Sequence, residues 1–166
     1  MTVTVNGTTG VSLSAPASVP QTALQSNVAG NGPAFSAFQS TGQSLVQSVL
    51  TKLQFQTKEF DTTNAFDNTT NFRFQPLVAG YYQVSGGVAM TTNGTNLVLV
   101  VYKNGGQFKF LQDSRTALAM TSGSCLVFLN GSTDYVELIA KQEAATQNAV
   151  AALSATYFQA FLARSA

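Results

Sequence analysis

The chain has 166 residues, a length that predicts one domain with a hydrophobic core of its own. Charged residues make up only 9% of it, against roughly 25% in ordinary soluble domains, and the net charge is +1 with the basic residues scattered singly. Binding to nucleic acids or anionic membranes needs a dense patch of positive charge. The chain has no such patch, so we expect neither as a partner.

The residue inventory also excludes the common catalytic and metal sites. There is no histidine and one cysteine, Cys125, which rules out a Ser-His-Asp triad, a Cys-His pair and a histidine-based metal site within one chain. Cys125 lies in the strand-like run SGSCLVFLN, where a small buried side chain is expected rather than a nucleophile. No glycine-rich phosphate loop is present. We therefore expect no catalytic residue, no cofactor and no enzymatic activity.

Residues 1–33 differ in composition from the rest of the chain. They hold no charged or aromatic side chain but three of the four prolines, and a strand-like alternation near the start stops at Asn6-Gly7. Such a segment cannot bury enough apolar surface to fold alone, and a disordered tail is the alternative interpretation. We interpret it as an attachment arm, with these candidate contact residues: Thr2, Val3, Thr4, Val5, Val11 and Leu13.

From residue 34 onward, short runs rich in β-branched and aromatic residues alternate with turn signals. Asn-Gly pairs at 93–94, 104–105 and 130–131 tolerate the positive φ values of tight turns. The runs beside them are predicted to be antiparallel strands: TNLVLVVYK, GQFKFLQ, SCLVFLN and DYVELIAK. Residues 44–55 and 143–158 are apolar enough to suggest helices, but we expect strand and loop at both. The whole pattern predicts an all-β sandwich or barrel.

The aromatic residues follow a spaced series that ends in a glycine, one residue and a tyrosine. The series consists of Phe55, Asp61, Phe66, Phe74, Gly80 and Tyr82. It resembles the signature of the complement component 1q globular head, which shares its trimeric jelly-roll fold with the tumour-necrosis-factor cytokines. The step from Phe66 to Phe74 is one residue longer than in that family, and the family's last two aromatic positions hold Val84 and Gly86.

Three further runs match the same family in the same order. PAFSAF (33–38) is similar to its opening strand, LVFLNGSTDYVEL (126–138) to a late hairpin and ATYFQAFLA (155–163) to its closing strand. The resemblance covers 34–166 and implies a homotrimeric, antiparallel jelly-roll β-sandwich head preceded by the extended arm of residues 1–33. It also implies that seven aromatic residues lie in the core or at the trimer axis: Phe35, Phe55, Phe66, Phe74, Tyr82, Phe158 and Phe161.

Three acidic residues, Glu59, Asp61 and Asp67, lie close enough in sequence to suggest a carboxylate pair or a calcium loop. The ligand spacing of a calcium loop is absent, and no residue matches a calcium motif of the family. We expect solvated loop charges here and no bound metal.

The segment before the head bears on the choice between a secreted complement-type protein and a virion protein. A secreted complement-type head would follow a signal peptide and a collagen stalk, and neither pattern is present. An uncharged arm before a neutral Asn-, Thr- and Gln-rich head resembles bacteriophage virion proteins. We therefore expect a structural protein made in the host cytoplasm and displayed on the virion surface, a trimeric capsid decoration or cement protein whose arm contacts the major capsid protein. The alternative is a tail-fibre or receptor-binding head that adheres to a host-surface glycan or protein.

Overall fold

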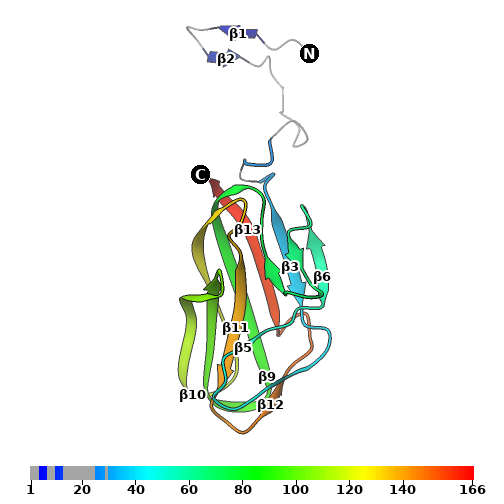
Figure 1. Cartoon of the computed structure of the whole chain (residues 1–166), viewed down its shortest axis with the longest axis vertical. Helices are drawn as coiled ribbons and strands as arrows, with labels where there is room; N and C mark the ends of the chain where they lie inside the picture. Colours follow the sequence, from blue (N-terminus) through cyan, green and yellow to red (C-terminus); the bar gives the residue numbers. More distant parts are fainter. Residues whose placement is uncertain (1–3, 7–9, 13–24, 29) are drawn as a thin grey trace.

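The computed structural model describes residues 4–6, 10–12, 25–28 and 30–166. All the secondary-structure elements in these residues are β-strands (Figure 1). Strands β1 (Thr4–Asn6) and β2 (Gly10–Ser12) form a hairpin that pairs with no other strand of the described chain. The head contains β3 (Ala34–Phe38), β4 (Gln43–Leu45), β5 (Thr51–Lys52), β6 (Thr57–Asp61), β7 (Phe66–Asp67), β8 (Arg73–Phe74), β9 (Ala79–Lys103), β10 (Gly106–Asn130), β11 (Val136–Gln142), β12 (Gln147–Ala149) and β13 (Tyr157–Ser165). Since the described residues form no helix, none of them offers a helical span for a membrane.

The centre of the fold is one long hairpin made of β9 and β10, each 25 residues long. Its two-residue turn has positive φ at both Asn104 (53°) and Gly105 (79°), as a tight hairpin turn requires. The first part of β9 pairs with β13 through residues 80–87, and its last part pairs with β11 through residues 97–103. The hairpin therefore contributes to two sheets. Register shifts in β10 between residues 114 and 120 lie where the pairing changes.

The two sheets share β9 and β10 and are completed by different strands. The first sheet has the order β10-β9-β13-β3-β6. The second sheet continues from β10 and β9 to β11, which pairs with β5 and β8, and β8 pairs with β7. A short pair, β4-β12, bridges to β9 at Met90. Among the described strands β10 pairs only with β9, so it forms an edge of both sheets, and Figure 1 shows it on the side of the head away from β3 and β6.

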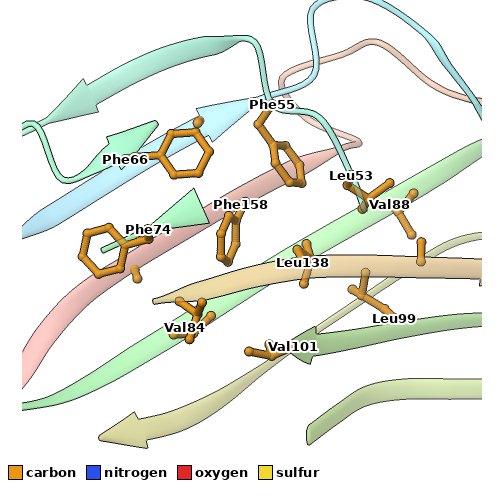
Figure 2. Close-up of a cluster of buried hydrophobic side chains, with 14 of the residues drawn as sticks. Leu53, Phe55, Phe66, Phe74, Val84, Val88, Leu99, Val101, Leu138 and Phe158 are labelled. Atoms are coloured by element: carbon orange, nitrogen blue, oxygen red, sulfur yellow. The ribbon is translucent and has the colours of Figure 1, made fainter. Parts of the chain in front are cut away.

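One hydrophobic core fills the space between the sheets, and aromatic rings make up much of it (Figure 2). Phe35 stacks on Phe66 with 4.5 Å between ring centroids and on Phe74 with 4.7 Å, while Phe158 meets Phe35 edge-on at 5.1 Å. Such offset and edge-to-face pairs are the favoured aromatic geometries. Aliphatic side chains from β9 and β11 continue the core to one side of the rings, among them Val84, Val88, Leu99, Val101 and Leu138 (Figure 2).

One expectation about local structure is confirmed by the fold and another is wrong. The expectation of strand and loop in residues 44–55 and 143–158 is confirmed, because they contain β4, β5, β12 and the first residues of β13 joined by loops. Backbone bonds from Ser48 to Gln142 and from Leu53 to Leu138 tie the first stretch to β11. The expectation of a tight turn at 93–94 is wrong, since these residues continue β9 where it passes from one sheet to the other. Sheet pairing on both sides has overridden the local turn preference there.

Candidate interaction surfaces

The outer side of the first sheet carries large apolar side chains that no other part of the described chain covers. Five of them are between 41% and 52% exposed, and we call them the apolar face: Phe60, Tyr81, Leu126, Phe128 and Phe161. They come from β6, β9, β10 and β13. Their clustering on one sheet, rather than scattered exposure, distinguishes this surface from an ordinary one.

Strand alternation and register place these side chains together. On β9, Tyr82 and Val84 point into the core. Tyr81 and Gln83, which alternate with them along the strand, therefore point outward. Tyr81 lies opposite Phe128, and their ring centroids are 5.4 Å apart. Gln83 lies opposite Leu126 on one side and Phe161 on the other. The apolar face is thus a continuous row of neighbours across β10, β9 and β13.

The apolar face is hollowed between Phe60 and Phe161. The hollow has a volume of about 180 Å³, and neutral polar side chains contribute to its lining: Gln83, Ser85 and Gln159. It is large enough for one side chain of a neighbouring molecule, and its polar groups are uncharged.

A second apolar surface lies along the free edge of β10. Phe108 is 39% exposed, Phe110 is 54% exposed and Met120 is 41% exposed. A free edge strand invites pairing with other chains, and natural proteins limit this with bulges and lysines. Here Lys109 stands between the two phenylalanines, and the strand has four register shifts. The edge is therefore suited to side-chain contacts more than to the addition of a strand.

Six of the seven aromatic residues singled out from the sequence lie in the core of the single chain. They are at most 2% exposed: Phe35, Phe55, Phe66, Phe74, Tyr82 and Phe158. Phe161 lies instead on the apolar face, 52% exposed. Sequence reasoning missed Phe60, Tyr81, Leu126 and Phe128. The unbroken apolar run from Cys125 to Leu129 was a usable signal, since a strand with apolar residues on both faces is expected to be covered on both sides.

The candidate arm residues are described only in part. Thr4, Val5 and Val11 lie in the β1-β2 hairpin, where Val5 is opposite Val11 and Thr4 is opposite Ser12. Thr2, Val3 and Leu13 lie outside the described residues.

The acidic residues after β3 serve local structure. The Asp61 carboxylate accepts hydrogen bonds from Lys58 Nζ at 2.9 Å and from the amides of Ala65 and Phe66, and its side chain is 4% exposed. Burial opposes ionisation, but these hydrogen bonds outweigh it and lower the pKa of Asp61. The expectation of a solvated loop charge is therefore wrong for Asp61. Glu59 accepts a hydrogen bond from the Ser36 hydroxyl at 2.6 Å, and no cluster of metal-ligating side chains occurs among the described residues.

Cys125 lies on β10, half-buried and packed against the core. Burial raises the pKa of its thiol, with nearby Lys109 opposing the shift. A thiol of raised pKa carries little thiolate at neutral pH, so this side chain fits a packing role.

Comparison with known proteins identifies the fold. No protein-family model matches the chain, and no curated protein is significantly similar to it. Among solved structures, the chain has the jelly-roll fold of the complement component 1q and tumour-necrosis-factor heads. The globular domain of zebrafish complement 1qA superposes with a TM-score of 0.56 and 17% identity, over 81% of this chain and 99% of that one.

Two other solved structures share the fold from different biological settings. The Eiger TNF of S. frugiperda matches with a TM-score of 0.60 and 10% identity, over 80% of this chain and 93% of that one. The PRD1 vertex protein P5 matches with a TM-score of 0.57 and 18% identity, over 77% of this chain and 92% of that one. At these identities both likenesses define the fold alone.

Proposed function

We propose that this chain is a non-enzymatic structural protein of a bacteriophage virion, which works as a homotrimer on the virion surface. The observation that carries the proposal is the apolar face on the first sheet. Contiguous exposed apolar surface of this kind marks an interface in soluble proteins. With so few charged residues in the chain, a second and a third copy of the same head are the partners that best match this face.

A closed ring of three copies needs two different surfaces on each copy. The apolar face supplies one of them. The β10 edge supplies the other, because Phe108 and Phe110 belong to a strand whose outer side pairs with no strand in the described part of the chain. We propose that the edge of one copy packs on the apolar face of the next, with the hollow between Phe60 and Phe161 receiving an apolar side chain.

The arm is proposed to anchor the trimer to the capsid, with the major capsid protein as the contacted partner. A two-stranded hairpin such as β1-β2 is marginally stable in water by itself, and its outer backbone groups can add to the edge of another sheet. Three arms on one trimer make the second and third docking steps intramolecular, so weak single contacts give stable attachment. The vertex location named for the PRD1 relative of this fold supports a place in a virion.

Deleting residues 1–24 tests the anchoring role. This deletion removes β1 and β2 and keeps every described residue from Gln25 onward. We expect the shortened protein to remain a soluble trimer and to lose its co-sedimentation with phage particles. Shortened protein that still sediments with particles at the full-length level would contradict the proposed arm.

Immunogold labelling of intact particles with an antibody to residues 34–166 separates decoration from the alternative. Label spread over the capsid is the result expected for a decoration or cement protein. Label confined to the tail would make the chain a tail-fibre or receptor-binding head and would overturn the capsid assignment. Particles without any label would remove the virion proposal altogether.

A further inference from the structure

A second and larger hollow opens on the head, between the loops that follow β6, β7 and β8. Its volume is about 760 Å³, within the range of small-ligand sites. Three charged side chains contribute to the lining, Lys58, Asp67 and Arg73, together with apolar residues such as Leu77 and Val78. The remaining lining residues carry amides or hydroxyls: Ser26, Thr63, Asn64, Asn68, Thr69, Asn71 and Gln75. None of these residues belongs to the apolar face or to the β10 edge.

The walls of this hollow are fixed by hydrogen bonds within the head. Asp67 accepts bonds from the amides of Thr69, Thr70 and Asn71, and from the Asn71 side chain at 2.7 Å. These bonds hold the pKa of Asp67 well below its usual range and order the loop after β7. Gln75 is held by its backbone bond to Ala65 and its side-chain bond to the loop after β10. A site that is ordered before binding loses less entropy when a ligand enters.

Each amide that holds the wall leaves its other polar atom unused. Asn68 and Asn71 donate through Nδ2, Gln75 donates through Nε2, and Asn64 accepts through Oδ1 from Lys58. The carbonyl oxygens of the first three and the Asn64 amino group have no hydrogen-bond partner in the described part of the chain. Donors and acceptors are therefore both available around the hollow, as a ligand with several hydroxyl groups requires.

Arg73 adds a positive charge whose donors are unused. Its guanidinium carbon lies over the Tyr135 ring, 4.3 Å from the centroid, and this cation–π contact helps to hold the group in place. Within the described residues it forms no hydrogen bond and no ion pair, although Asp67 is its cross-strand neighbour on β7. Lys58, the other cation of the lining, is already paired with Asp61. A guanidinium with free donors can bind a carboxylate through two parallel bonds.

We propose that this hollow binds a sugar that carries a carboxylate, such as a uronic acid unit of a polysaccharide. Arg73 takes the carboxylate, and the Asn, Gln and Thr side chains around it take the ring hydroxyls. The proposal goes beyond the structural role and does not rest on the trimer, because every residue that lines the hollow belongs to one chain. Ser26 and Pro33, near the end of the arm segment, line part of the hollow, and the proposed ligand contacts come from the head.

Ligand-observed NMR titration of the full chain tests the proposal with two sugars that differ only in the carboxylate, galacturonate and galactose. We expect galacturonate to bind about tenfold more tightly, the discrimination expected for a charge-assisted hydrogen-bonded pair. Arg73→Gln should reduce galacturonate binding to the galactose level and leave galactose unchanged. Arg73→Lys, which keeps the charge and loses the planar fork, should fall between the two.

Arg164→Gln is the matched control, since it removes one exposed arginine that does not line the hollow. It should bind galacturonate as the unaltered protein does. Three results would overturn the proposal. The first is equal affinity for the two sugars, and the second is displacement of bound galacturonate by acetate at the same concentration as by unlabelled galacturonate. The third is a loss of galacturonate binding in Arg164→Gln as large as the loss in Arg73→Gln. The comparison of the two sugars on the unaltered protein keeps the test valid even if an Arg73 variant folds poorly.

Discussion

Tyr81 and Tyr82 are neighbours in the chain, and the strand geometry gives them opposite environments. Tyr82 is fully buried, donates its hydroxyl to the Val78 carbonyl at 2.7 Å and meets Phe74 edge-on at 5.5 Å. Tyr81 is 46% exposed on the apolar face. The same residue type therefore serves the core at one position and the proposed interface at the next.

Truncating Tyr82 separates its two contributions to stability. Tyr82→Ala should lower the free energy of unfolding by about 3–5 kcal/mol, because it leaves a cavity in the aromatic core. Tyr82→Phe keeps the ring and should cost about 1 kcal/mol, because the Val78 carbonyl loses its donor. Urea unfolding at one fixed protein concentration measures both. Near-native stability of Tyr82→Ala would show that this ring is not part of the core.

Asp61 makes the stability of the head depend on acid. Its folded pKa lies below the ordinary 3.8, so the stabilisation it provides is present above about pH 4 and is lost as the pH falls through the lowered value. Asp61→Asn should be less stable than the unaltered protein by about 1–2 kcal/mol at pH 7, because the bond with Lys58 loses its charge. The difference should shrink below pH 4. Thermal unfolding of both proteins from pH 7 to pH 3 would reveal a constant difference if Asp61 had no such role.

At the scale of elements, the two ends of β10 depend on glycines with the same backbone conformation and different surroundings. Gly105 has a φ of 79°, and a Cβ added there would lie 3.4 Å from the Tyr135 hydroxyl, an ordinary van der Waals contact. Gly131 has a φ of 71°, and a Cβ there would lie 2.3 Å from the backbone nitrogen of Ala79. Only the second position combines strain with a clash against backbone.

Substituting alanine at each of the two glycines therefore gives a matched pair of variants, whose losses of unfolding free energy can be compared. Gly105→Ala should cost about 1–2 kcal/mol of unfolding free energy, the penalty of a positive φ for a residue with a Cβ. Gly131→Ala should cost a further ~1–3 kcal/mol, because the backbone of β9 has to move. Equal losses in urea unfolding would show that the contact between the loop and β9 does not limit the packing there.

The sequence predicted the strands well where local and distant preferences agree. Asn104-Gly105 joins two apolar runs and forms the tight turn expected of it. Asn130-Gly131 begins a longer loop, in which the Asn130 side chain accepts bonds from the amides of Ser132, Thr133 and Asp134. The pair at 93–94 forms no separate turn, because the strands on both sides belong to the same long hairpin. A local sequence pattern does not predict pairing between residues that lie far apart in the chain.

The candidate sites were harder to predict, for a physical reason. The resemblance identified six core rings, but it could not show that Phe161 faces outward, since one residue of register decides the face. The hollow beside Arg73 has no sequence signature at all. Its walls depend on side-chain bonds of Asp67 and on conformations such as the positive φ of Asn64 and Phe72, which follow from the folded loops.

At the scale of the whole molecule, the apolar face and the low charge of the chain lead to one expectation about assembly. Since few charged groups steer or hold the copies, their association should depend on apolar burial. Replacing Phe161 or Leu126 with glutamate places a carboxylate in the proposed interface, where it has no partner and cannot stay hydrated. Either variant should therefore fold and sediment as a 17.5 kDa monomer, whereas we expect the unaltered protein to sediment as a trimer.

Leu153→Glu is the control for this experiment. Leu153 is 49% exposed, like the face residues, but it lies in the loop before β13. It should sediment as a trimer and melt as the unaltered protein does, because its carboxylate stays in water. Sedimentation velocity with near-native circular dichroism distinguishes dissociation from unfolding. Trimers of Phe161→Glu and Leu126→Glu with unchanged stability would place the subunit contact elsewhere on the head, and the apolar face would then need another partner.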